Sequence, residues 1–216
     1  MIFLSAAMLG LWTMIIVISS CRYFQQGFDM LLKTLSFDDP FFKRVMYVDD
    51  IKKVTRDNLS HAKSMVVDYG QSDIKALCVL LDIKTQFPEN YFILITRDAC
   101  FDSTIENILI NTVADMTIDC KSAVKKLTAC LTHFAGADQQ ITIFKNMHWY
   151  TLEREKSLTK METRLLPYIV SGKKNKEISR YVNLTGKTVS HHRRNIYKKF
   201  AVNNLMGLYK MFDYTM

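Results

Sequence analysis

The stretch TGKTVSHHRRNIYKKFAVN, residues 185–203, separates into two faces when it is drawn as a helix. With a rotation of about 100° per residue, its apolar side chains gather on one face: Val189, Ile196 and Phe200, with His192 beside them. The opposite face carries cations and small polar side chains: Lys187, Ser190, His191, Arg194 and Lys198. Such a helix can dock on a small core and reach base edges in a DNA major groove. A solvated basic surface helix shows the same pattern.

The net charge of +8 is concentrated near the C-terminus. Residues 1–150 carry 15 Lys and Arg against 16 Asp and Glu, whereas residues 151–216 carry 14 against 5. This asymmetry predicts a C-terminal module that faces a polyanion, either nucleic acid or an anionic membrane surface.

The composition indicates a globular protein that is not an enzyme. The 216 residues are 49% hydrophobic, which suffices for one or two domains with ordinary cores. The five cysteines form no CxxC pair and match no disulfide framework or zinc site. Residues 186–188, Gly-Lys-Thr, lack the earlier glycine and the preceding strand of a P-loop. We therefore expect no catalytic residue, metal or cofactor.

The N-terminal 21 residues contain no charged side chain. Their apolar run is compatible with a signal peptide or with an inner-membrane anchor through residues 1–20. No Lys or Arg precedes the run, however, and residues 14–19, MIIVIS, have the length and β-branched character of a buried parallel strand. We expect a cytoplasmic protein whose first strand begins near Met14, after an apolar extension of residues 1–13.

Strand-like and helix-like segments alternate through residues 14–134. The expected strands are 14–19, 45–49, 64–69, 91–96 and 116–119. The expected helices are 22–35, 50–61, 73–87, 103–113 and 122–134. This alternation predicts an α/β fold with a doubly wound, parallel, five-stranded sheet.

The N-terminal domain resembles a response-regulator receiver domain. Asp68 ends the third expected strand and Thr96 ends the fourth. In that family the Asp is phosphorylated, and the Thr or Ser moves with the phosphoryl group. The resemblance therefore implies that Asp68 is a vestigial phosphoacceptor, whereas the residue alone also fits an ordinary carboxylate at the end of a strand.

Two parts of the receiver pattern are missing. The family's acidic pair after the first strand, which holds Mg²⁺, is replaced by residues 19–21, Ser-Ser-Cys. The family's Lys at the end of the fifth strand is replaced by Cys120, and Lys121 comes one residue late. We expect a degenerate receiver that does not use conventional aspartyl phosphorylation.

A connection of residues 135–157 separates this domain from an all-helical one at 158–216. In the latter, Thr159 and Glu162 form a capping box that begins the first helix. Pro167 is expected to kink that helix, which is tolerable if the kink faces solvent. A short helix capped by Asn175, a tight turn and the basic helix follow, which is the helix-turn-helix order. Asn204 caps a last helix.

These segments are similar to the LuxR/FixJ (NarL)-type helix-turn-helix. The matching residues are Leu158-Thr159, Glu162, Leu165-Leu166, Gly172, Asn175-Lys176-Glu177-Ile178, Leu184, Thr185, Thr188-Val189, His192, Asn195-Ile196, Lys199-Phe200, Val202 and Asn204. The resemblance implies that Ser190, His191 and Arg194 face bases. Lys187, Thr188 and nearby cations such as Lys198 would contact phosphates.

The resemblance implies a bacterial transcriptional regulator that reads double-stranded DNA in the major groove through the segment Asn175 to Arg194. It would act as a homodimer, or as a heterodimer with a related regulator. His192 lies on the inner side and is not expected to contact DNA. The alternative is a membrane-tethered interaction protein whose basic C-terminal domain binds anionic lipid or a protein partner.

Overall fold

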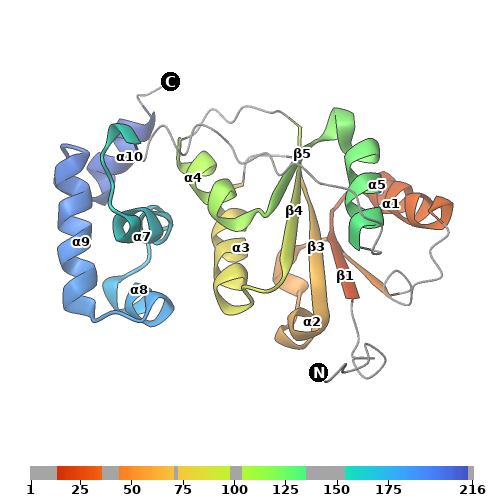
Figure 1. Cartoon of the computed structure of the whole chain (residues 1–216), viewed down its shortest axis with the longest axis horizontal. Coiled ribbons are helices and arrows are strands. Elements are labelled where there is room, and N and C mark those ends of the chain that lie inside the picture. The colour runs from red at the N-terminus through yellow and green to blue at the C-terminus, as the bar shows by residue number, and fades with distance from the viewer. Residues whose placement is uncertain (1–13, 36–43, 71–72, 98–103, 135–153, 214–216) are drawn as a thin grey trace, which may run out of the picture. The chain divides into compact units, whose positions relative to one another are not determined.

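The computed structural model describes residues 14–35, 44–70, 73–97, 104–134 and 154–213 (Figure 1). Its residues group into two compact units. The first comprises 1–70, 87–97 and 117–143, and the second comprises 71–86, 98–116 and 144–216. The predicted domain borders at 134 and 158 remain predictions.

The first unit is built on a five-stranded sheet with the order β2-β1-β3-β4-β5. The strands are β1 (Met14–Ile18), β2 (Val45–Val48), β3 (Ala62–Tyr69), β4 (Tyr91–Thr96) and β5 (Met116–Asp119). β1 pairs in parallel with both β2 and β3, and β3 pairs in parallel with β4. This is the strand order of the flavodoxin-like doubly wound sheets. It confirms the predicted fold class.

The centre of the sheet is the core of this unit. Residues 15–17 of β1 and 92–94 of β4 have no exposed surface. Successive side chains of a strand point to opposite faces, so unbroken burial means that both faces of these strands are covered. Burial on both faces explains why the sequences of these strands are continuously apolar.

Among the described residues, the first unit contains the α-helices α1 (Arg22–Thr34), α2 (Arg56–His61) and α5 (Ala123–Phe134). α1 and α5 fall within the predicted segments. The single helix predicted over 50–61 is wrong, because a 3₁₀ turn, η3 (Ile51–Lys53), comes first and Val54 is extended. Thr55 then begins α2 as its N-cap.

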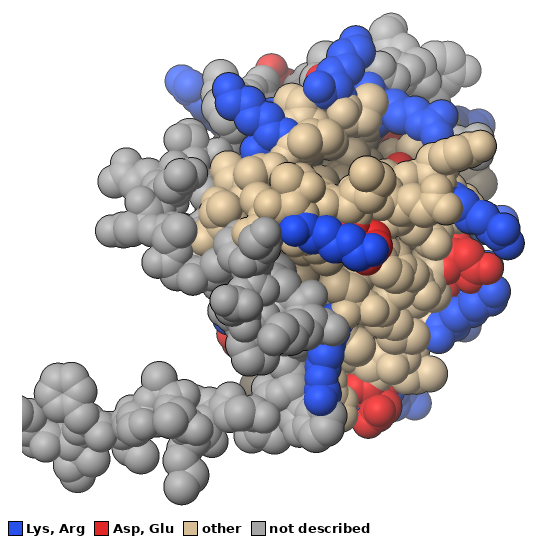
Figure 2. Space-filling model, turned by 90° about the vertical axis from the view of Figure 1, so that its right-hand side faces the viewer, with Lys and Arg blue, Asp and Glu red and all other residues tan. Residues whose placement is uncertain are grey.

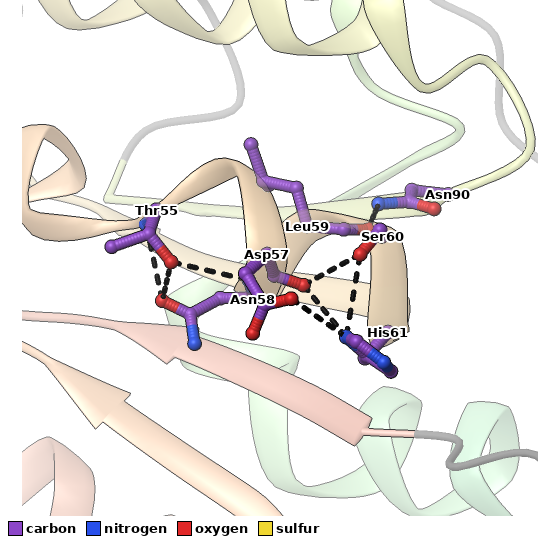
Figure 3. A network of polar contacts seen from close by, with 7 residues as sticks. All are labelled: Thr55, Asp57, Asn58, Leu59, Ser60, His61 and Asn90. Carbon is purple, nitrogen blue, oxygen red and sulfur yellow. Dashed lines mark hydrogen bonds and ion pairs between the residues drawn. The ribbon is translucent and has the colours of Figure 1, made fainter.

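Reciprocal hydrogen bonds at Thr55 explain why α2 starts anew (Figure 3). The Thr55 hydroxyl accepts from the Asn58 backbone N–H at 3.2 Å, and the Asn58 side chain accepts from the Thr55 N–H at 3.1 Å. Further along, the buried Asn90 amide donates to the Leu59 carbonyl at 3.0 Å. A cap and a tertiary hydrogen bond thus hold a helix too short to be stable alone.

The second unit is helical. It contains α3 (Ile74–Gln86), α4 (Thr104–Val113), α7 (Lys160–Val170), α8 (Asn175–Val182), α9 (Gly186–Lys199) and α10 (Leu205–Asp213). All six lie where the sequence predicts helices, to within two residues at each end. No helix within the described ranges is long and apolar enough to cross a bilayer, and residues 1–13 lie outside those ranges.

A buried carboxylate joins the start of α7 to the end of α9. Glu162, 2% exposed, accepts from the Thr159 N–H at 2.8 Å, which confirms the predicted capping box. The same oxygen accepts from the Lys199 ammonium at 2.6 Å, and that ammonium also donates to the Ser157 carbonyl at 2.6 Å. Burial acts to raise the pKa of Glu162, but the hydrogen bonds from Lys199 and Thr159 outweigh it and lower the pKa.

Pro167 lies on the buried side of α7, and not on the solvent side where we expected a kink to be tolerated. Its own carbonyl still accepts from the Ser171 N–H at 3.0 Å, at the C-terminal end of the helix. The helix ends at Val170, Ser171 is its C-cap, and Gly172 follows with a φ of 80°, which favours a residue without a Cβ. The proline ring thus contributes to the core.

We predict that Glu162→Gln destabilises the α7–α9 pair by about 2 kcal/mol near neutral pH, because it leaves the Lys199 ammonium without its buried counter-charge. Hydrogen exchange of α7 and α9 amides measures the loss. The exposed Glu155→Gln is the matched control.

The effect should depend on pH. Since the folded-state pKa of Glu162 is lowered, its contribution is present above the unfolded pKa of about 4.3 and is lost as the pH falls through the folded value. Wild type and variant should therefore converge in acid. A gap that widens there would contradict this assignment.

Candidate nucleic-acid interface

The turn between α8 and α9 is fixed by local hydrogen bonds. Asn183 ends α8 in the left-handed region, with φ 55° and ψ 48°, a conformation that Asn tolerates well. The Leu184 N–H then donates back to the Ser179 carbonyl at 3.1 Å. Thr185 caps α9 by accepting from the Thr188 N–H at 3.1 Å. These bonds set the direction in which α9 leaves the turn.

The predicted cap of α8 is one residue off. Asn175 is the first residue of the helix, and Lys174 occupies the N-cap position. The Glu177 carboxylate accepts from the Lys174 backbone N–H at 2.8 Å. The Glu177 carboxylate in the first turn therefore caps the start of the helix, a role that we expected the Asn175 side chain to have.

The inner face of α9 is buried as predicted. Val189 and Ile196 have no exposed surface, and Phe200, the residue after the helix, is 2% exposed. The Phe200 ring meets the Phe212 ring of α10 edge to face, with 5.5 Å between centroids. This apolar contact fixes the rotation of α9 about its own axis, so the opposite face is turned outward.

His192 lies between the two faces. Its side chain is partly exposed, but its Nδ1 is buried and has no hydrogen-bond partner among the described residues. The inward placement of the ring matches the prediction.

Arg193 is a structural cation that sequence reasoning missed. Its Nη2 donates to the Lys173 carbonyl at 2.6 Å, in the turn between α7 and α8, and its Nη1 lies 3.4 Å from the Tyr197 hydroxyl. In the sequence Arg193 is one more cation in a basic run. Only the position of the Lys173 carbonyl distinguishes it from Arg194.

The outer face of α9 presents cations to solvent. Lys187, His191, Arg194 and Lys198 are exposed, and Ser190 is half-buried beside them. The three Lys and Arg side chains of this set have no ion-pair partner in the described ranges. The Thr188 hydroxyl lies 2.8 Å from the Thr185 hydroxyl at the start of the helix. We call Lys187, Ser190, His191, Arg194 and Lys198 the outer face.

Two more exposed cations lie on α8. Lys176 and Arg180 both reach solvent. They were predicted only as members of the segment Asn175 to Arg194, without roles of their own. Together with the outer face they make the helix pair α8–α9 strongly positive, which suits a polyanion.

In the first unit, the predicted phosphoacceptor faces a serine. The Ser19 hydroxyl, at the end of β1, donates to the Asp68 carboxylate at 2.7 Å and accepts from the Cys21 N–H at 3.1 Å. Ser19 is 3% exposed. The place where the receiver pattern has a carboxylate thus holds a neutral donor that binds Asp68 directly.

The other acidic side chains near this edge of the sheet have partners of their own. Asp49 pairs with Lys53 at 2.7 Å, and Asp50 accepts from the Lys52 N–H at 2.9 Å. A Mg²⁺ ion prefers several oxygen ligands in octahedral geometry, usually including carboxylates. Neither of these two neighbouring carboxylates is therefore free to bind Mg²⁺ together with Asp68.

The order and geometry of α7 to α10 define a helix-turn-helix domain. Residues 156–212 match the family described as bacterial regulatory proteins, luxR family. This confirms the predicted family of the C-terminal domain.

Two curated relatives match the same region. One is the "Uncharacterized response regulatory protein YgeK" of Escherichia coli K12, 43% identical over 56 residues, which are 26% of this chain and 38% of that protein. The other is the Fimbriae Z protein of the same strain, 43% identical over 51 residues, which are 24% of each chain. The match therefore spans well under half of either relative.

A solved structure of the Salmonella typhimurium RcsB response regulator is similar over most of the chain. It covers 94% of this chain and 98% of its own, with 16% identity and a TM-score of 0.43.

We predict that the neighbouring substitutions Arg193→Ala and Arg194→Ala have opposite profiles. Arg193→Ala should destabilise the helix-turn-helix by roughly 1–3 kcal/mol, because it removes a charged hydrogen bond to a turn carbonyl. Arg194→Ala should change stability by less than about 0.5 kcal/mol, as surface substitutions do. Hydrogen exchange of α8 and α9 compares the two. Equal losses would show that Arg194 also has a structural role.

Proposed function

We propose that this protein is a sequence-specific DNA-binding transcriptional regulator that acts through the outer face of α9. The observation that carries the proposal is that α9 combines a buried apolar face with an exposed basic face. One face is packed on the core through Val189, Ile196 and Phe200, and the other holds exposed cations that have no ion-pair partner among the described residues. A recognition helix needs both a fixed rotation and free polar groups.

Distinct roles follow from side-chain chemistry. Arg194 can donate two hydrogen bonds to guanine O6 and N7, while Ser190 and His191 supply shorter polar contacts to base edges. Lys187 and Lys198, near the two ends of the helix, suit phosphates on either side of the groove, and Thr188 can donate to a phosphate at the helix start. The match of residues 156–212 to the luxR family supports this assignment.

We propose that the first unit does not use conventional aspartyl phosphorylation. The Ser19 hydroxyl already binds Asp68 at 2.7 Å, and Cys120 stands where the receiver pattern has its Lys. Both changes remove charge that would hold a phosphoryl group and its Mg²⁺. Asp68 is then a structural acceptor, and the unit serves another regulatory purpose.

Dimer formation is part of the proposal, and exposed apolar side chains support it. Met206 on α10 is 62% exposed. In the first unit, Tyr23 and Met30 of α1 and Val124 of α5 are also exposed. Figure 2 shows the side of the molecule on which Figure 1 draws α1 and α5, where a broad uncharged surface is interrupted by a basic side chain next to an acidic one and is bordered by further charged residues. Such surfaces suit association with a second copy or a related regulator.

The proposed function places the protein with DNA in the bacterial cytoplasm. The membrane-tethered alternative depends on residues 1–20, of which 1–13 lie outside the described ranges. It explains the charge asymmetry but not the cap, turn and core of the helix-turn-helix.

We predict different losses from two substitutions on the outer face. Arg194→Ala should lower affinity for the preferred site by about 1–3 kcal/mol and relax the sequence preference, because a base contact is lost. Lys198→Ala should weaken binding to all sequences alike and reduce the dependence of log K on log salt by about one unit. Fluorescence anisotropy with specific and scrambled duplexes over a salt series measures both.

The preferred DNA sequence for this experiment is first identified by selecting bound duplexes from a random pool. Lys210→Ala, on α10, is the matched control for loss of an exposed cation. If neither outer-face substitution changes DNA affinity more than this control does, the outer face is not the reading surface.

We also predict that the wild-type protein gains no phosphoryl group from acetyl phosphate with Mg²⁺. Intact-mass measurement detects the addition, and Asp68→Asn is the blank. Asp68→Asn should in addition leave DNA affinity unchanged. A phosphoryl adduct in the wild type that is missing in Asp68→Asn would contradict the proposed loss of phosphorylation.

A further inference from the structure

Asn195 forms a side-chain pair with His191, a residue of the outer face of α9. They lie four residues apart, which places them on neighbouring turns of the same side of the helix. The Asn195 Nδ2 lies 3.2 Å from the His191 Nε2. His191 is exposed, and Asn195 is half-buried.

This contact decides where the imidazole carries its proton. An amide nitrogen donates hydrogen bonds and cannot accept them, so the His191 Nε2 must be the acceptor. In a neutral imidazole the proton then resides on Nδ1. A hydrogen bond to one ring nitrogen sets the tautomer in the same way at metal sites.

We propose that Asn195 is a specificity-determining positioning residue, which holds His191 as the Nδ1–H tautomer and so presents a hydrogen-bond donor to the major groove. The proposal rests on the proposed DNA-binding function. It assigns a role to Asn195, which makes no direct base contact in this scheme. Nδ1 is the one polar atom of the ring that Asn195 leaves available.

A fixed donor restricts which bases are accepted. In the major groove the acceptors are guanine O6 and N7, adenine N7 and thymine O4, whereas cytosine presents an amino donor. An Nδ1–H group therefore favours a base pair that offers an acceptor at its position and disfavours the cytosine amino group. An unconstrained imidazole could donate or accept from its outward nitrogen and would discriminate less.

The first test measures the tautomer in the full-length protein without DNA. Nitrogen-15 NMR of a histidine-labelled sample distinguishes Nδ1–H from Nε2–H at alkaline pH, where an ordinary imidazole is neutral. The signal is assigned by its loss in His191→Ala. We expect Nδ1–H in the wild type. Asn195→Asp replaces the donor by an acceptor of similar size and should move the proton to Nε2.

The second test uses selection of bound duplexes from a random pool. Asn195→Ala should reduce the base preference at a single position by roughly tenfold, and His191→Ala should reduce it at the same position. The double variant should lose no more than His191→Ala alone, because Asn195 acts through the ring. Asn203→Ala, an exposed Asn outside the helix, is the matched control and should keep the full preference.

The outcomes separate this inference from the proposed function. A wild-type protein that enriches no sequence overturns both. A wild-type protein that enriches a sequence, while Asn195→Ala keeps the preference that His191→Ala loses, overturns only the role of Asn195. A proton on Nε2 in the wild type also overturns it.

Discussion

The buried Glu162 carboxylate is the constraint on which the helix-turn-helix depends. It joins the first turn of α7 to the last turn of α9 through Thr159 and Lys199, which are 40 positions apart in the printed sequence. A buried charge is costly unless it is paired and hydrogen-bonded, so these bonds admit few alternative arrangements of the two helices. The core contacts of Val189 and Ile196 set the rotation of α9, and Glu162 sets where its C-terminal end is held.

The cations of α9 consequently fall into two groups. Arg193 and Lys199 donate to internal acceptors and hold the helix in place. Lys187, Arg194 and Lys198 point away from the core and have no ion-pair partner in the described part of the chain. A count of charges treats all five alike, but only the second group is available to a polyanion. The structural cations are what keep the available ones in a fixed line.

The sequence predicted most of the fold because its signals are local. The apolar runs that form β1 and β4 are buried on both sides, and the capping box at Thr159 needs only residues four positions apart or fewer. The features that were predicted wrongly or left open depend on residues distant in sequence, or on competition between two local structures. Which side Pro167 faces depends on what packs on α7 and was left open by the sequence, and the role of Arg193 depends on a carbonyl 20 residues away. The helix expected over 50–61 divides because the cap at Thr55 competes with continuation of η3.

The same contrast between local and non-local signals applies to the two candidate sites, which are the outer face of α9 and the surroundings of Asp68. On α9, helical periodicity alone selects the outer face, since a single helix fixes which residues share a side. At the end of β1, the sequence shows that an acidic pair is missing but not that Ser19 turns its hydroxyl onto Asp68. That hydrogen bond gives the carboxylate a neutral partner at the place where the receiver pattern has further negative charge to attract a divalent cation. In the proposed function, the unit therefore has no charge-driven switch at Asp68. If it regulates α9, it must therefore do so through what its surfaces bind, and exposed Tyr23, Met30 and Val124 are the side chains available for that contact.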